Sequence, residues 1–306
     1  MANVTAEEVK VLRHRTGAGL MDSKRALEAC NGNIEEAVDL LRKKGLAVAA
    51  NKSGRVAAEG LIGVYVDGKK GVLVEVNAET DFVARNELFQ KYVVDILELA
   101  CLKQLCVDSL KAAKHPAKEH TVSDELTNLI AVIGENMNLR RVEHVTVSDG
   151  VVASYVHNKI SPTLGKIGIL VALESTGDKE KLLELGRQLA MHIAAAQSLS
   201  ISVADLDPAI VERERAIVTE QAQSTGKIGF IDKIIEGRLR KFYEEVVLLE
   251  QVFVIDGETK VKDLIARVSQ EIGAPITVKK FVRFALGEGI EKQTVDFAAE
   301  VAAQLK

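Results

Sequence analysis

The sequence predicts an α+β fold, and three observations carry this prediction. Amphipathic helical patterns dominate the first 45 residues and return after residue 207. Between them, short β-branched runs are joined by turns, and one order of strand, strand and helix occurs twice. Strand pairs joined by short turns favour small antiparallel sheets, which helices then cover on one face. We therefore expect helical units around a core of two small sheets.

The N-terminal 45 residues have complete signals for three short helices. Thr5 and Glu8 have the spacing of a capping box, which marks the start of the first helix. The third helix is predicted to begin after Asn33 and to end at Gly45. The next residues, 46–58, are then predicted to be a linker.

The internal repeat is the most informative feature of the sequence. The run "EGLIGVYVDGKKGVLVEV" aligns with "DGVVASYVHNKISPTLGKIGILVAL", so that Gly60 matches Gly150. Continuing this alignment past the strands places Asp81 on Asp178 and Phe82 on Lys179. Both aspartates are predicted helix N-caps. In the first copy, the helix after the two strands is predicted to have one apolar face, made by Leu88, Phe89, Tyr92, Val93, Ile96, Leu97 and Ala100.

These patterns divide the chain into five parts. They are a three-helix domain (1–45), a linker (46–58), a first core subdomain (59–147), a second core subdomain (148–286) and a C-terminal helical module (287–306). A charged helical hairpin (207–247) is predicted as an insertion in the second core subdomain. The sequence "TVDFAAEVAAQLK" predicts that the chain ends in an amphipathic helix.

Composition indicates a soluble globular protein. Of the 306 residues, 47% are apolar and 27% are charged, and the net charge is −4. Three cysteines without CxxC spacing fit neither a disulfide framework nor a zinc site. No apolar run is long enough for a membrane span, and the first residues lack a secretory pattern. We expect a cytoplasmic protein with no membrane contact and no direct contact with nucleic acid.

The sequence argues against an enzyme. "STGKIG" and "LGKIG" lack the spacing of a phosphate-binding loop, and no Ser, Cys or His is set in a nucleophile motif. The histidines of "HPAKEH" are five residues apart in a Pro-containing segment, so a solvated loop is favoured over a metal site. "NLRR" and "GRLRK" are interpreted as solvated helix faces. No cofactor and no metal are expected.

The turn "VNAETDFVARNELF" leaves two interpretations of Phe82 open. The side chain is either a core aromatic buried under the turn or a residue displayed for a partner. Under the alignment above, the second copy has Lys179 at this position. A turn that tolerates a lysine does not need an aromatic to close.

Six motifs in order carry a family resemblance over almost the whole chain. They are "LRHRTGAGLMDSKRALEACNGNIEEAV", "EVNAETDFVARNELF", "IGENMNLRR", "SYVHN", "IIEGRLRKF" and "FVRFALGEGIEK". With these motifs the chain resembles the elongation factor Ts family, the guanine-nucleotide exchange factors for elongation factor Tu in bacterial translation. The resemblance implies an N-terminal domain like the ubiquitin-associated fold, two repeated core subdomains and a protruding helical hairpin.

The resemblance also implies where the partner binds. The family's Thr-Asp-Phe-Val motif matches Thr80, Asp81, Phe82 and Val83, whose aromatic side chain wedges into the G domain of Tu and disturbs its magnesium site. Other implied contacts with Tu, in its GDP-bound and nucleotide-free forms, are Arg13, Met21, Lys24, Ile133, Gly134 and His157. The longer second hairpin, with "KISPTLGK", lies beside His157.

Two other function classes remain as alternatives. A non-catalytic scaffold associated with RNA or the ribosome would use the N-terminal helices and "RLRK" as contacts, and salt-sensitive RNA binding would favour it. An undetected enzyme would need a cleft with acid–base residues. A homodimer through the helical hairpin is a further expectation.

Overall fold

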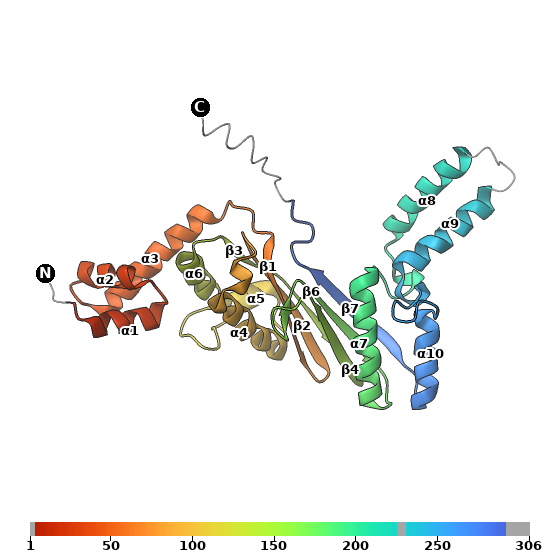
Figure 1. Ribbon diagram of the computed structural model, residues 1–306, viewed down its shortest axis with the longest axis horizontal. Helices are drawn as coiled ribbons and strands as arrows, with labels where there is room; N and C mark the ends of the chain where they lie inside the picture. Colours follow the sequence, from red (N-terminus) through yellow and green to blue (C-terminus); the bar gives the residue numbers. More distant parts are fainter. Residues whose placement is uncertain (1–3, 225–230, 292–306) are drawn as a thin grey trace.

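The protein is an elongated arrangement of helices and sheets. A computed structural model describes residues 4–224 and 231–291 (Figure 1). The three N-terminal helices lie at one end, two sheets lie in the middle, and a helical hairpin lies at the other end. The α+β prediction is confirmed. The C-terminal helix predicted from "TVDFAAEVAAQLK" and most of the hairpin tip lie outside the described residues.

The first three helices are α1 (Ala6–Thr16), α2 (Leu20–Ala29) and α3 (Ile34–Lys52). Thr5 and Glu8 form the predicted capping box, and the Asn33 side chain caps α3. The three helices enclose a small apolar core of Val9, Leu12, Ala26, Leu27 and Ala37.

Helix α3 does not end at Gly45, and that prediction is wrong. Gly45 is buried, and a Cβ built on it would lie 3.6 Å from the Cβ of Ala131 on α6 (Val122–Ile133). Because the glycine allows this close helix contact, α3 continues to Lys52, and about half of the predicted linker (46–58) is helical. The Lys52 ammonium donates to the Gly134 carbonyl at 2.5 Å, which attaches the end of α3 to the core.

Two antiparallel sheets make up the core. One has the order β3-β2-β1-β5, with β1 (Glu59–Asp67), β2 (Lys70–Ala78), β3 (Met137–Thr146) and β5 (Leu164–Gly165). The other has the order β4-β6-β7, with β4 (Gly150–His157), β6 (Ile167–Glu174) and β7 (Thr277–Ala285). The short strand β5 comes from the insertion in the second hairpin, between β4 and β6 in the chain, but it pairs with β1 and so belongs to the first sheet.

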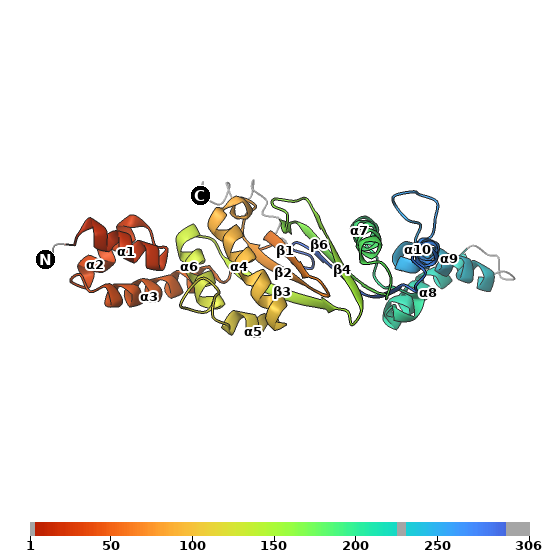
Figure 2. The same ribbon diagram turned by 90° about the horizontal axis from the view of Figure 1, so that it is seen from below.

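The core has four layers, helix, sheet, sheet and helix (Figure 2). The facing sheets share an apolar cluster that includes Ile62, Leu73, Val152 and Leu170. Helix α4 (Glu87–Lys103) covers the first sheet together with α6 and the short α5 (Val107–Ala112). Helices α7 (Lys179–Ala196) and α10 (Val261–Ile272) cover the second sheet.

The repeat extends further than the sequence alignment. Helices α6 and α10 occupy equivalent places, and each ends at a left-handed glycine, Gly134 or Gly273. Strands β3 and β7 complete the two copies, and their pairing shifts register at matching places in β2 and β6. The predicted helical hairpin, α8 (Pro208–Ser224) and α9 (Ile231–Val246), lies between α7 and α10 in chain order.

The alignment of the two covering helices is wrong. Eight residues separate β2 from α4, whereas four separate β6 from α7. Asp178 caps α7 as predicted, but the cap of α4 is Asn86 and not Asp81. Phe82 therefore has no counterpart in the second copy, and its alignment with Lys179 is incorrect. Leu88, the second residue of α4, is 51% exposed and does not lie on the buried face, so its assignment to that face is wrong.

Candidate functional site

Phe82 is displayed on the surface at the tip of the turn between β2 and α4. Its side chain is 76% exposed, the highest value among the large apolar residues that the structure describes. Asp81 is exposed as well, whereas Val83 is buried in the cluster under α4. The Phe82 carbonyl accepts from the Arg85 N–H at 3.1 Å and starts a single 3₁₀ turn, Val83–Arg85. The interpretation of Phe82 as a core aromatic is thus excluded.

Thr80, on the other side of the tip, is held by Glu135. The Glu135 carboxylate accepts the Thr80 N–H at 2.9 Å and the Thr80 hydroxyl at 2.7 Å. The reciprocal contact is made by Glu79, the residue before Thr80. Its carboxylate accepts the N–H of Asn136, the residue after Glu135, at 2.5 Å. The two segments therefore exchange carboxylate contacts just beyond the last paired residues of β2 and β3. We call these two reciprocal contacts the carboxylate clasp.

The clasp brings two predicted groups of site residues together. Ile133 and Gly134 lie at the end of α6, directly before Glu135 in the chain. Gly134 has φ of +85°, and its N–H caps α6, while half-buried Ile133 packs on the apolar cluster under α4. The predicted motif from Thr80 to Val83 and the predicted contacts at Ile133 and Gly134 thus belong to one surface region.

The other predicted contact residues lie elsewhere. Arg13 is exposed near the end of α1, and on α2 Met21 is 55% exposed. The ammonium of Lys24 lies 3.7 Å from the Glu28 carboxylate one turn along α2. His157 is exposed at the end of β4, and its Nδ1 lies 3.2 Å from the Tyr155 hydroxyl. These residues lie on α1, α2 and β4, outside the segments that form the Phe82 tip and the carboxylate clasp.

Comparisons with known proteins agree on one family. The family model described as "Elongation factor TS" matches residues 79–288. A protein named elongation factor Ts from Paramagnetospirillum magneticum is 57% identical over 305 residues, which is 99% of this chain and 98% of that protein. The chain belongs to the elongation factor Ts family. Proteins of the same name from Rhodospirillum centenum (56%, 99% of both chains) and Rhizobium etli (53%, the full length of both) are similar over equal lengths.

The region matched to the elongation factor Ts model covers only part of the predicted site. It includes the Phe82 tip, the carboxylate clasp, Gly134 and His157, whereas Arg13, Met21 and Lys24 precede it. The full-length relatives in the family span those N-terminal residues too.

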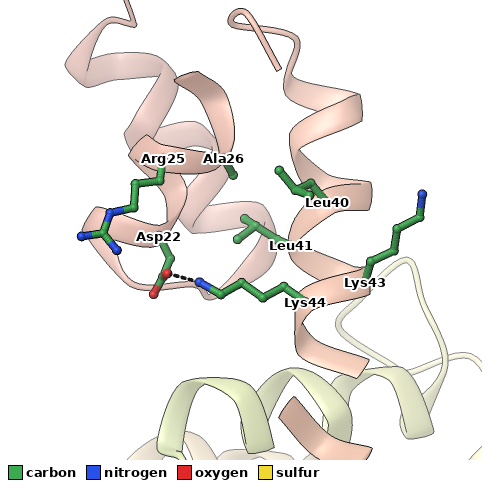
Figure 3. A pocket seen from close by; sticks show the side chains of 7 residues that line it. All are labelled: Asp22, Arg25, Ala26, Leu40, Leu41, Lys43 and Lys44. Carbon is green, nitrogen blue, oxygen red and sulfur yellow. Dashed lines mark hydrogen bonds and ion pairs between the residues drawn. The ribbon is translucent and has the colours of Figure 1, made fainter. Parts of the chain in front are cut away.

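A groove separates α2 from α3 in the N-terminal helices (Figure 3). It has a volume of about 410 Å³ and is lined by Asp22, Arg25, Ala26, Leu40, Leu41, Lys43 and Lys44. The Lys44 ammonium pairs with the Asp22 carboxylate across it at 2.5 Å and lowers the pKa of Asp22. None of the three predicted N-terminal contact residues lines this groove.

The "NLRR" segment is not a solvated helix face, so that interpretation is wrong. It lies on β3, where Arg140 and Arg141 both pair with Glu75, which is fully buried on the neighbouring strand β2. Glu75 also accepts the Gly287 N–H at 2.9 Å from the segment after β7. Burial by itself would raise the pKa of Glu75, but the Gly287 N–H, the Asn77 amide and Arg141 together lower it.

The "GRLRK" segment, in contrast, does lie on a helix. Its basic residues Arg238, Arg240 and Lys241 are exposed on α9. The interpretation of this segment as a solvated helix face is therefore confirmed.

The "HPAKEH" segment is only partly a solvated loop. His115 is buried and stacks on Tyr92, with ring centroids 6.1 Å apart, and desolvation lowers its pKa. His120 lies 2.7 Å from the Glu125 carboxylate. Within residues 4–224 and 231–291, no group of three or more His, Cys, Asp or Glu side chains could hold a metal ion. No helix in this part of the chain is long and apolar enough to cross a membrane.

Sequence reasoning misses both Glu135 and Glu75 as important residues. Glu135 stands inside the motif "IGENMNLRR" and Glu75 begins "EVNAETDFVARNELF". A signal is present, since each is an acidic residue within a family motif. Thr80 lies 55 positions from Glu135, and Arg140 and Arg141 lie 65 and 66 positions from Glu75, so only the fold brings these pairs together.

Proposed function

We propose that this protein is a cytoplasmic translation elongation factor that promotes release of GDP from elongation factor Tu. Membership of the elongation factor Ts family supports this proposal. The single observation that carries the mechanism is the exposed Phe82 between a clasped Thr80 and a buried Val83. An exposed aromatic with both flanks fixed is suited to enter a pocket on a partner.

The proposed mechanism needs no chemistry on this chain. Phe82 enters the G domain of Tu and disturbs its magnesium site, so that the factor binds the nucleotide-free form more tightly than the GDP form. By linkage, a factor that prefers the empty state weakens nucleotide binding by the same ratio. GTP can then bind and displace the factor. An aromatic anchor serves this task because it buries roughly 150–250 Å² with few rotamers to restrict.

Arg13, Met21 and Lys24 are proposed to dock the N-terminal helices on Tu, with Ile133 and Gly134 beside the Phe82 tip and His157 on the second sheet. All three N-terminal residues are exposed, which supports this role. Docking through them would raise affinity, whereas Phe82 would act on the nucleotide site.

A scaffold associated with RNA or the ribosome is the second candidate. The exposed basic side chains on α9 support it, but Arg140 and Arg141 do not, because both are engaged by Glu75. A homodimer through α8 and α9 is a separate proposal. It is supported by Ile210 and Ile217, which are exposed seven residues apart and so lie on one helix face.

The test mixes the protein with Tu loaded with a fluorescent GDP analogue and excess unlabelled GDP. We expect substoichiometric protein to accelerate loss of fluorescence, with no GTP hydrolysis when Tu is left out. An unchanged release rate would exclude the exchange function. Salt-sensitive binding to RNA without Tu would favour the scaffold.

A further inference from the structure

We propose that Glu135 is the positioning residue of the exchange site, because its carboxylate fixes the direction in which Phe82 projects. This inference rests on the proposed function. Glu135 accepts both the N–H and the hydroxyl of Thr80, and two hydrogen bonds to one residue leave that residue little freedom to turn. Three residues further on, Val83 is buried. Only Asp81 and Phe82 lie between these two fixed points.

The clasp lies where the sheet no longer supports the chain. The last pair of the β2–β3 ladder is Ala78 with Met137, so the amides of Thr80 and Asn136 have no ladder partner. Glu135 and Glu79 replace the missing carbonyls, each by accepting the amide of the opposite segment. Hydrogen bonds to an ionised acceptor are stronger than neutral ones, so two carboxylates can hold these segments together without a strand.

The second copy of the repeat serves as an internal comparison. Its α10–β7 turn has Ala274 and Pro275 where the first copy has Glu135 and Asn136, counted from the equivalent glycines at the ends of α10 and α6. The same copy lacks the four extra residues that display Phe82. The repeated fold therefore forms without a clasp, and the clasp occurs only where there is a tip to hold. Because the clasp and the tip occur in the same copy and are both missing from the other, the clasp has a role in presenting the tip rather than in building the subdomain.

The clasp is also connected to the N-terminal helices. Lys52, at the end of α3, donates to the Gly134 carbonyl, and the Asn136 side-chain amide donates to the Arg55 carbonyl at 2.7 Å. The Arg55 guanidinium lies 3.5 Å from the Glu79 carboxylate. The segment of residues 134–136 thus contacts both the end of α3 and the base of the Phe82 tip. Glu135 acts on Tu only through Thr80 and Phe82.

The experiment measures release of the fluorescent GDP analogue at increasing factor concentration, which separates the maximal rate from the half-saturating concentration. For Glu135→Ala we expect the maximal rate to fall about tenfold, the loss typical of a charged hydrogen bond, with the half-saturating concentration little changed. Glu135→Gln keeps an acceptor oxygen and should recover part of the rate. Glu143→Ala is the matched control, since it removes an exposed carboxylate from β3 and should leave the rate unchanged.

Combination with Phe82→Ala decides between positioning and a general structural role. If Glu135 acts through Phe82, Glu135→Ala should not slow the Phe82→Ala protein any further. A full additional tenfold loss in the double variant, or a wild-type rate for Glu135→Ala alone, would overturn the proposal. Thermal melting of each variant checks folding, and Thr80→Val, which removes only the hydroxyl donor, provides a milder change at the same contact.

A readout without Tu keeps the two proposals separate. Amide hydrogen exchange of the protein alone should show that Thr80 is protected in the wild type and loses protection in Glu135→Ala, while the amides of α4 keep theirs. Equal Thr80 exchange in both proteins would contradict the role of Glu135 in holding Thr80. Wild-type protein that leaves GDP release unchanged would instead exclude the proposed function, with the role of Glu135 still decided by the exchange data.

Discussion

Arg140 donates to both carboxylate oxygens of Glu75, at 3.1 and 3.2 Å, although Glu75 is fully buried. Arg141 donates to the same carboxylate, and its guanidinium lies 4.0 Å from the ring centroid of Phe284 on β7. Gly287 donates its N–H from the segment after β7. One buried acid therefore joins β2, β3 and the chain that leaves the second sheet.

Glu75→Ala should destabilise the protein strongly. The substitution would leave two guanidinium groups and the Gly287 N–H without their acceptor, next to a cavity. Removing one partner of a buried ion pair typically costs about 3–5 kcal/mol. Urea denaturation measures the change in the free energy of unfolding. The control is Glu143→Ala, an exposed pair with Lys280 that is worth no more than about 1 kcal/mol. Equal losses in the two variants would contradict the role of Glu75.

Stability should fall as the pH drops below about 6.5, in part because of His192. Its Nδ1 accepts the Val254 N–H at 3.2 Å, its other ring nitrogen lies 2.9 Å from the Gln251 side-chain oxygen, and burial lowers its pKa. The unfolded histidine, with a pKa near 6.5, binds a proton more readily than the folded one. The contribution to stability is thus complete above that pH and is lost as the pH falls through the folded pKa.

Melting temperatures of the wild type and His192→Asn at neutral and mildly acidic pH test this expectation. The variant should be less stable overall but should lose less stability on acidification. His14→Asn, at an exposed position, is the control for the substitution itself. If His192→Asn loses as much stability on acidification as the wild type, the buried ring does not contribute to the pH dependence.

Gly60→Ala and Gly150→Ala should both be destabilising, since the two glycines hold equivalent places in the repeat. Their φ angles are +124° and +132°, and an added Cβ would overlap the carbonyl oxygens of Val76 and Leu173. Such overlaps cost roughly 1–3 kcal/mol or more. Gly237→Ala, in open space on α9, should be neutral or stabilising. Urea denaturation compares the three variants, and a neutral Gly60→Ala would contradict this account.

Met21→Ala should weaken docking without lowering the maximal rate of GDP release. Because the side chain is 55% exposed, the fold should lose little stability. If it anchors the N-terminal helices on Tu, truncation should cost about 1–2 kcal/mol of binding, which raises the half-saturating concentration about tenfold. Leu46→Ala, half exposed on α3, is the control. An unchanged half-saturating concentration would remove Met21 from the docking surface.

Local signals predict the helix starts, whereas contacts between distant segments do not show in the sequence. Thr5 and Asn33 cap the helices that they are expected to cap. Gly45 has the local signal of a helix end, but it lies inside α3. Its contact with Ala131 on α6, which favours a glycine there, is made only in the folded chain. The extra residues around Phe82 become visible only when the starts and buried faces of α4 and α7 are compared.

The candidate site is predictable in its residues but not in its construction. Phe82 stands in a motif that the family resemblance identifies, while its exposure follows from the burial of Val83 and the hydrogen bonds that hold Thr80. Glu135 reaches Thr80 from 55 positions away, and strand pairing brings Arg140 to Glu75. No local pattern marks such pairs.

The most direct test of the account is GDP release by Phe82→Ala, measured together with its thermal stability. Because Phe82 is exposed, the variant should melt close to the wild type, whereas Phe89→Ala, a fully buried control on α4, should lose about 3–5 kcal/mol. The release rate with Phe82→Ala should fall about 30-fold, which corresponds to about 2 kcal/mol for a binding anchor. A Phe82→Ala protein that melts many degrees lower, yet accelerates release normally while folded, would contradict the central claim.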